Sequence, residues 1–241
     1  ASEKCNRLVR EENMKTVLIT GADRGIGFAL CECFLKNGWT VMAGQYMPDW
    51  KELEKLKEIY QDRLFLIPLD VSDTESVRRA YVAVSEKIDV LDILVNNAGI
   101  IRDDSCESVL STFNTNTLGP VRMVEIFLPL MEKGMKRLCF VSSEAGSITA
   151  AHRTSNFAYC MSKTALNMAV RLMFNSLRSR GYTFRLYHPG WVKSYMSGRK
   201  SEAGTYEPEE TAASAFSQFI EDRDWEDALV LTDINNLSWP F

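Results

Sequence analysis

Along most of the chain, short apolar runs of strand type alternate with longer segments of helical character, and this alternation limits the fold more than any other feature of the sequence. Six such runs occupy residues 16–20, 40–44, 64–69, 93–97, 137–143 and 184–189. The runs are apolar throughout, which is typical of parallel strands covered by helices on both faces. A repeated strand–helix order predicts βαβ units in a doubly wound α/β sheet.

The segments between these runs carry apolar residues at helical spacing. The expected helices span residues 25–37, 49–61, 74–87, 107–133, 156–180 and 208–221. A last apolar patch at residues 228–232 supplies a further strand, so we expect a seven-stranded parallel sheet flanked by helices on both faces. Two of the helices, 107–133 and 156–180, are long. We expect their apolar faces to pack either against the sheet or against another subunit.

The composition is that of a soluble globular protein, with 46% hydrophobic and 25% charged residues among 241. About 150 residues per domain would allow two domains, but α/β folds of this length are often single units. No linker, internal repeat or low-complexity tract interrupts the chain. We therefore expect one domain over residues 14–241, preceded by a polar and poorly ordered N-terminal extension at residues 1–13.

Several classes of function are disfavoured by charge and composition. The net charge is −4 and the basic residues are scattered, so no nucleic-acid partner is expected. No segment approaches the roughly 18 apolar residues of a membrane span, and the opening residues lack a signal-peptide core, which predicts a cytoplasmic protein without membrane contact. Six cysteines at irregular spacings and two histidines predict no metal site. The chemistry is therefore expected from ordinary side chains or an organic cofactor.

A glycine-rich loop, Gly21 to Gly27, follows the first predicted strand and opens the first predicted helix. Its three glycines allow a tight turn, a close approach of the backbone to a pyrophosphate, and packing of the helix on the sheet. Free N–H groups and the helix dipole favour phosphate charge at this position. The loop predicts dinucleotide binding, with a plain strand-to-helix turn as the alternative.

The preference between NAD and NADP is usually set where the second strand ends, because an acidic residue there binds the ribose hydroxyls of NAD. This chain has Gly44-Gln45-Tyr46 at that place, with no acid. Arg24, inside the glycine loop, is suited to a 2′-phosphate because a guanidinium matches its charge and geometry. We therefore expect NADP rather than NAD, with a solvated loop charge as the alternative role of Arg24.

Tyr159 and Lys163 lie four residues apart near the start of a predicted helix, and so on one helix face. A phenol with its usual pKa of about 10 exchanges protons poorly at neutral pH, and a nearby ammonium lowers that pKa. The pair can therefore shuttle a proton. By itself the spacing is equally that of an ordinary surface contact.

Taken together, these motifs resemble those of the short-chain dehydrogenase/reductase family, from Lys15 to the C-terminus and in the family's order. The motifs are the glycine loop, Asp70-Val71, the Asn-Asn-Ala-Gly run at 96–99, the Ser-Ser pair at 142–143, Tyr159-x-x-x-Lys163 and the Pro-Gly-Trp-Val run at 189–192. The segment after Met196 looks most like the C-factor-like carbonyl reductases. The resemblance implies a single Rossmann domain.

The resemblance also assigns roles in catalysis. It implies that Tyr159 is the general acid/base and that Lys163 lowers the pKa of Tyr159 and binds the nicotinamide ribose. Ser143 would hold the substrate oxygen, and Asn116 would tie a water to Lys163 in a proton relay. Hydride transfer to a carbonyl carbon builds negative charge on the oxygen, which hydroxyl donors stabilise and protonate.

The loop between Ser143 and Tyr159 is longer than in many members of the family. It is therefore expected to bulge over the active site. Ser142 or Ser147 remains an alternative for the working hydroxyl.

The cofactor is expected to contact the glycine loop and the ends of the later strands. The expected contacts are Gly21, Asp23, Arg24, Gly25, Ile26, Gly27, Gln45, Asp70, Val71, Asn97, Ala98, Gly99, Tyr159, Lys163, Pro189, Gly190, Val192 and Ser194. Ser194 stands where members of this family commonly have a threonine, and it keeps the hydroxyl.

The sequence thus predicts an NADP-dependent oxidoreductase that transfers a hydride between the nicotinamide and a small carbonyl or alcohol substrate. The resemblance further implies a homodimer or homotetramer built through the two long helices. A dinucleotide-binding regulatory protein without turnover is the alternative, because a fold does not establish a function. A sugar-nucleotide epimerase is disfavoured, because about fifty residues follow Gly190 and cannot form a substrate domain.

Overall fold

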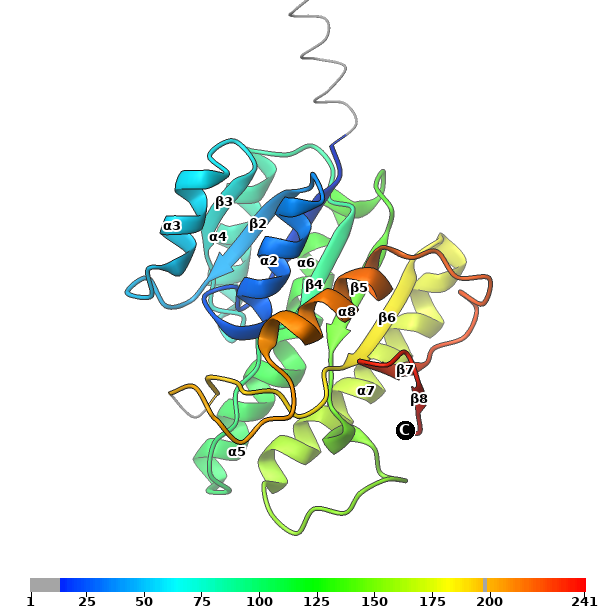
Figure 1. Cartoon of the computed structure of the whole chain (residues 1–241). Helices are drawn as coiled ribbons and strands as arrows, with labels where there is room; N and C mark the ends of the chain where they lie inside the picture. The colour runs from blue at the N-terminus through cyan, green and yellow to red at the C-terminus, as the bar shows by residue number, and fades with distance from the viewer. Residues whose placement is uncertain (1–13, 197–198) are drawn as a thin grey trace, which may run out of the picture.

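A computed structural model describes residues 14–196 and 199–241 (Figure 1). The expected N-terminal extension at residues 1–13 lies outside the described residues. The strands are β1 (Thr16–Ile19), β2 (Thr40–Gln45), β3 (Leu64–Pro68), β4 (Ile93–Asn96), β5 (Arg137–Val141), β6 (Thr183–His188), β7 (Leu231–Asp233) and β8 (Ser238–Trp239). They form one sheet in the order β3-β2-β1-β4-β5-β6-β7-β8.

The strands β1 to β7 pair in parallel, as expected from their apolar sequences. The chain winds from β1 outward to β3, returns to β4 on the other side of β1, and then winds outward again. Such a reversal opens a crevice beyond the carboxyl ends of the central strands, where open α/β sheets bind their ligands. The predicted doubly wound architecture is confirmed.

The edge of the sheet differs from the prediction in one strand. The last apolar patch forms β7 later than expected, and β8 pairs with it antiparallel. The carboxylate of Asp233 organises this hairpin, since it accepts hydrogen bonds from the N–H groups of Asn235 and Leu237 and from Nε1 of Trp239. β8 has two residues and no apolar run, so the sheet has an eighth strand that periodicity does not show.

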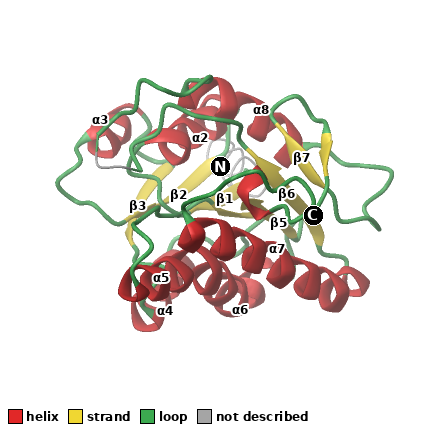
Figure 2. Cartoon of the chain, turned by 90° about the horizontal axis from the view of Figure 1, so that it is seen from below, coloured by secondary structure: helices red, strands yellow, loops and turns green. Residues whose placement is uncertain are grey.

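Helices cover both faces of the sheet. They are α2 (Gly25–Lys36), α3 (Glu52–Ile59), α4 (Thr74–Ser85), α5 (Cys106–Phe113), α6 (Gly119–Met131), α7 (Phe157–Leu177) and α8 (Pro208–Ile220). Figure 2 shows α2, α3 and α8 on one face and α4, α5, α6 and α7 on the other. Each face has its own apolar core, and no helix among the described residues has the length and apolar character needed to cross a membrane.

The helix expected over residues 107–133 is divided in two. A π-helical turn, Asn114–Leu118, separates α5 from α6. It brings Asn116 and Thr117 against α7, where the Thr117 hydroxyl donates to the carbonyl oxygen of Ser162. Single π-helical turns occur frequently at functional sites, because the wider turn redirects side chains.

Two buried arginines on neighbouring strands hold the C-terminal end of α8. Arg185 on β6 donates from Nε to the carbonyl oxygen of Gln218, and Arg137 on β5 donates from Nη1 to that of Phe219. Both guanidinium groups also donate to the carbonyl oxygen of Glu221. The last carbonyls of a helix have no partner inside the helix and carry its negative dipole end, so cations stabilise them.

Candidate active site

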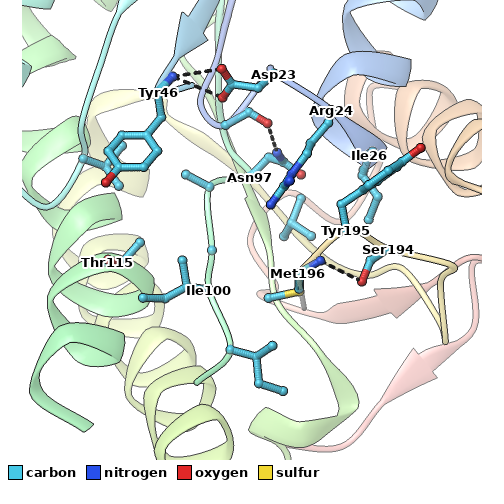
Figure 3. A pocket seen from close by; sticks show the side chains of 18 of the residues that line it. Asp23, Arg24, Ile26, Tyr46, Asn97, Ile100, Thr115, Ser194, Tyr195 and Met196 are labelled. Atoms are coloured by element: carbon cyan, nitrogen blue, oxygen red, sulfur yellow. Dashed lines mark hydrogen bonds between the residues drawn. The ribbon is translucent and has the colours of Figure 1, made fainter. Parts of the chain in front are cut away.

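A cavity of about 550 Å³ opens at the carboxyl ends of the parallel strands (Figure 3). Its walls come from the segments that follow β1, β2, β3, β4, β5 and β6. This volume lies within the usual range for cofactor and small-molecule sites. The position is the one that the winding of the sheet predicts for a ligand.

The glycine loop has the tight geometry that the sequence predicted. Gly21 has a positive φ of 62°, and a Cβ there would lie 2.9 Å from the Cα of Ala98. A Cβ on Gly27 would lie 2.1 Å from the carbonyl oxygen of Gly21, so α2 can approach the loop only with glycine at this position. No side chain caps the first turn of α2, whose N–H groups therefore remain available to a phosphate.

The Asn-Asn-Ala-Gly run supports the glycine loop. The side-chain amide of Asn97 donates to the carbonyl oxygens of Thr20 and Gly21, at 2.9 and 3.1 Å. The Thr20 hydroxyl accepts in return from the N–H groups of Asn97 and Ala98. Asn97, Ala98 and Gly99 all line the cavity, and the side chain of Asn97 fixes the loop that would hold a pyrophosphate.

At the end of β2, the structure places Tyr46 and Met47 in the cavity wall, and Gln45 is not among the lining residues. Successive side chains of a strand point to opposite faces. Tyr46, the residue after Gln45, therefore lies in the cavity wall where Gln45 was expected. The carboxylate of Asp23 accepts from the backbone N–H groups of Tyr46, at 3.1 Å, and Met47, at 2.8 Å (Figure 3). Asp23 lines the cavity but mainly fixes the chain beyond β2.

Arg24 lies between two aromatic rings at the mouth of the cavity. Its guanidinium carbon is 5.0 Å from the ring centroid of Trp50 and 5.7 Å from that of Tyr195. The two rings meet edge to face at 5.3 Å. Within the part of the chain that the structure describes, no acceptor takes a hydrogen bond from Arg24, so its N–H groups can serve an anion.

Asp70 and Val71 line the cavity after β3, as predicted. The Asp70 carboxylate accepts from the N–H and the hydroxyl of Ser72, at 2.8 and 2.7 Å. This local turn holds the segment in place at the side of the cavity.

Tyr159 and Lys163 both line the cavity from the first turns of α7. Nζ of Lys163 donates to the carbonyl oxygen of Val141 at 2.8 Å and lies 5.8 Å from the centroid of the Tyr159 ring. Burial lowers the pKa of Lys163 to about 8. The ammonium therefore remains mostly charged at neutral pH.

The pKa of Tyr159 moves upward, although the sequence predicted a shift downward. Burial raises this pKa to about 12, a hydrogen bond with Ser143 opposes the change, and the negative charge of Glu144 adds to it. The free-energy cost of removing water from the phenolate is larger here than the stabilisation that nearby positive charge gives it. The phenol is therefore a proton donor at neutral pH.

Of the three candidate serines, Ser142 lines the cavity, and Ser143 and Ser147 do not. The Ser143 hydroxyl donates to Glu144 at 2.6 Å and accepts from the N–H of Ala145 at 3.1 Å. The hydroxyls of the other two are engaged elsewhere, since Ser142 donates to Asn167 and Ser147 accepts from a backbone N–H. The hydroxyls of all three serines thus have partners inside the protein, and the choice of Ser143 stays a prediction.

Asn116 is fully buried, and its side chain holds two elements together. Its amide accepts from the N–H of Ile100 at 2.8 Å, donates to the carbonyl oxygen of Ile100 at 2.9 Å, and donates to the Ser162 hydroxyl at 3.0 Å. A Cβ on Gly99 would lie 3.4 Å from Oδ1 of Asn116 and 3.7 Å from Nζ of Lys163. Asn116 and Lys163 thus both lie beside Gly99, and the water relay between them stays a prediction.

Most of the predicted cofactor contacts share this one cavity, and five predicted site residues do not line it: Gln45, Asn116, Ser143, Gly190 and Val192. Gly190 and Val192 instead shape the chain beyond β6. A Cβ on Gly190 would overlap the ring of Tyr206, and Val192 forms a parallel bridge with Tyr206. That packing brings Ser194 to the cavity wall.

The sequence reasoning missed a group of lining residues that flank the predicted ones. They are Tyr46, Met47, Leu69, Ser72, Ile100, Ile101, Arg102, Ser111, Asn114, Thr115 and Val141. Most of them lie within a few residues of a predicted contact, so extending each strand end along the chain would have found them. Asn114 and Thr115 flank the predicted Asn116 on the π-helical turn, whereas Ser111 on α5 carries no such signal. Among the described residues, no cluster of side chains is suited to a metal ion.

The chain is similar to proteins of one family along most of its length. The family model for short chain dehydrogenases matches residues 15–204. C-signal of Myxococcus xanthus is 41% identical over 115 residues, which cover 45% of this chain and 69% of that protein. An uncharacterized oxidoreductase of Schizosaccharomyces pombe is 32% identical over 192 residues, which cover 76% of each chain.

The fold is shared with solved structures. The NADPH-bound carbonyl reductase from chicken fatty liver superposes with a TM-score of 0.85 at 28% identity, over 95% of this chain and 99% of that chain. The family model, the relatives and the shared fold agree with the motifs and with the cavity that they line. The chain therefore belongs to the short-chain dehydrogenase family of NAD(P)-dependent oxidoreductases.

Proposed function

We propose that this protein is an NADP-dependent oxidoreductase that transfers a hydride between the nicotinamide and a small carbonyl or alcohol substrate, with Tyr159 as general acid/base. One observation carries the proposal: Tyr159 and Lys163 line the same cavity as the glycine loop. A proton donor and a phosphate-binding loop in one cavity are what reduction by a dinucleotide requires.

The chemistry divides between the cofactor and the chain. A bound nicotinamide supplies or accepts the hydride. The neutral phenol of Tyr159 gives its proton to the substrate oxygen as negative charge develops there, which is general acid catalysis. We assign Ser143 as the second hydroxyl at this oxygen, and the Lys163 ammonium, 5.8 Å from the ring centroid of Tyr159, contributes positive charge to the same end of the cavity.

Three observations support NADP over NAD. No carboxylate follows β2 that would bind the ribose hydroxyls of NAD, and Asp23 is engaged by backbone N–H groups. The guanidinium of Arg24 has its donors available between Trp50 and Tyr195. The chicken carbonyl reductase is a protein with NADPH bound. We therefore assign Arg24 to the 2′-phosphate, for which a charge-assisted hydrogen bond is strong.

Replacing Arg24 by leucine is expected to lower the preference for NADPH over NADH. Loss of charged hydrogen bonds of about 1.5–3 kcal/mol corresponds to a fall of about 10- to 100-fold in the ratio of kcat/KM values for the two cofactors. Steady-state kinetics with each cofactor measures this ratio. Lys51→Leu is the control, because Lys51 is an exposed cation paired with Glu54. An unchanged ratio in the Arg24 variant would remove Arg24 from the phosphate site.

The proposed function is tested by the consumption of NADPH with a panel of aldehydes, diketones and quinones, with NADH in parallel. We expect turnover of at least one of these classes, with NADPH preferred. Tight binding of NADPH without turnover of any class would favour the alternative, a dinucleotide-binding regulatory protein.

We also propose that two copies associate through α5 and α7. Both helices carry large exposed apolar side chains, which are Leu110, Phe157, Met161, Met168 and Leu172. Contiguous exposed apolar surface is typical of protein interfaces. We expect a dimer or tetramer in light scattering at micromolar concentration, and a shift toward monomer for Leu172→Glu. Leu237→Glu, at an equally exposed leucine near β8, is the control. A monomeric wild type would contradict the proposal.

A further inference from the structure

Arg24 is the only cation that the glycine loop brings to the cavity, and the end of β2 adds none. The other cations in the described cavity wall, Arg102 and Lys163, come from the segment after β4 and from α7. The choice between NADPH and NADH is therefore left to a single guanidinium. An arginine side chain has many rotamers, and fixing one of them on a ligand costs conformational entropy. The contacts that hold Arg24 before a ligand binds thus affect how strongly it binds.

Trp50, one of the two rings beside Arg24, belongs to the loop between β2 and α3. The guanidinium carbon of Arg24 lies 5.0 Å from the Trp50 ring centroid. The loop is itself tied to the glycine loop. The N–H of Trp50 donates to the carbonyl oxygen of Met47 at 3.0 Å, and the N–H of Met47 donates to the Asp23 carboxylate at 2.8 Å. Trp50 is therefore fixed relative to the residue next to Arg24.

Tyr195, the other ring, comes from the segment after β6, far along the chain from the glycine loop. The parallel bridge between Val192 and Tyr206 anchors this segment. Tyr195 lies against the start of α2, because a Cβ on Gly25 would be 3.8 Å from Cδ2 of its ring. The guanidinium carbon of Arg24 is 5.7 Å from the ring centroid, and Figure 3 shows the two side chains next to each other at the cavity. Two separate segments thus meet at Arg24.

The two rings hold Arg24 without using its hydrogen-bond donors. A guanidinium is planar, and its five N–H groups lie in that plane. An aromatic ring attracts the cation through the ring face and takes no N–H group. A carboxylate would take them, as Glu144 takes Nε and Nη2 of Arg153. Asp23, the acid next to Arg24, is instead occupied by backbone N–H groups of the loop after β2. Arg24 is therefore held in place with its donors open to an anion.

We propose that Trp50 and Tyr195 are positioning residues for Arg24: the two rings hold its guanidinium toward the 2′-phosphate and so determine how strongly this protein prefers NADPH to NADH. The inference rests on the proposed function, in which Arg24 binds that phosphate. Neither ring needs to contact the phosphate. The rings fix the guanidinium before the cofactor binds, which reduces the conformational entropy lost on binding.

The test measures the ratio of the Kd for NADH to the Kd for NADPH in variants that lack one ring. Trp50→Leu and Tyr195→Leu each remove a ring and keep an apolar side chain. We expect each to lower the ratio by about 2- to 5-fold, the effect of one cation–π contact, and the double variant to lower it further. Trp50→Phe and Tyr195→Phe keep a ring and should retain the wild-type ratio. Fluorescence titration with each cofactor gives both Kd values and needs no turnover.

The ratio separates positioning from a general structural role. NADPH and NADH differ only in the 2′-phosphate, so a variant that merely loosens a segment weakens the binding of both equally. In an Arg24→Leu background, removing either ring should no longer change the ratio, because the group that the rings position is absent. Trp225→Leu is the matched control, because the Trp225 ring centroid lies 4.6 Å from the guanidinium carbon of Arg223 and Trp225 does not line the cavity. It should retain the wild-type ratio.

Equal ratios in the wild type and in both leucine variants would overturn the inference, as would a ring effect that persists without Arg24. If Arg24→Leu lowers the ratio and the ring variants do not, the phosphate site of the proposed function stands without the inference. A lowered ratio in the ring variants of a protein that reduces no carbonyl supports the inference and contradicts the proposed function. Thermal unfolding identifies any variant that fails to fold, and the other ring, on a separate segment, then decides the test.

Discussion

Replacing Tyr159 by phenylalanine is expected to lower kcat for carbonyl reduction by about 10²- to 10⁴-fold, the usual contribution of a positioned general acid. The substitution removes the hydroxyl and keeps the ring, so the contact with Lys163, 5.8 Å from the ring centroid, persists. Binding of NADPH should therefore change little. Steady-state kinetics with the best carbonyl substrate, and a fluorescence titration with NADPH, measure the two effects separately.

The control for this prediction is Tyr60→Phe, a tyrosine at the end of α3 that packs against Arg63 away from the cavity. It should retain the activity of the wild type. If Tyr159→Phe kept more than about a tenth of the wild-type kcat, another group would supply the proton, since general acid catalysis is worth far more than that. Loss of NADPH binding in Tyr159→Phe would instead indicate a structural role.

Arg185→Met is expected to destabilise the protein by about 3 kcal/mol, the lower end of what breaking a buried ion pair costs. The Arg185 side chain is 2% exposed and makes a bidentate pair with Glu226. It also donates to the carbonyl oxygens of Phe184, Gln218 and Glu221. A methionine fills much of the same volume but removes the guanidinium donors to the Gln218 carbonyl oxygen and to the Glu226 carboxylate, while Arg137 still donates to Glu221.

Thermal unfolding measures this effect, and a loss of 3 kcal/mol corresponds to a fall in Tm of roughly 6–12 °C for a chain of this size. Arg180→Met is the matched control, because Arg180 pairs with Glu132 at the surface, where its side chain is 49% exposed. Exposed pairs contribute about 0–1 kcal/mol, so the control should unfold close to the wild type. Equal Tm values for the two variants would show that the buried cluster does not stabilise α8.

The local pattern of the sequence determined the order of the elements. The six apolar runs became β1 to β6, because parallel strands buried on both faces must be apolar at nearly every position. The loop from Gly21 to Gly27 was equally readable, since its tight turn requires glycine. Both features depend on residues that are close together in the sequence, so the sequence alone can predict them.

What the tertiary structure decided involves partners far apart in the chain. The Asp233 carboxylate stabilises β8 by accepting hydrogen bonds from the hairpin that follows it. The predicted long helix is interrupted at Asn114–Leu118, where the side chain of Asn116 donates a hydrogen bond to the Ser162 hydroxyl. Tyr46 rather than Gln45 lines the cavity, and the Asp23 carboxylate from the glycine loop holds the backbone N–H of Tyr46.

The protonation state of Tyr159 shows the same division most clearly. The spacing of Tyr159 and Lys163 indicated a reactive pair, and the two do share one cavity. The spacing also predicted a lowered pKa for the phenol, whereas burial and the charge of Glu144 raise it. The residues that can exchange a proton follow from the sequence alone, but their pKa values depend on which water is excluded and which charges are brought near, and only the packing of α7 on the end of the sheet decides that.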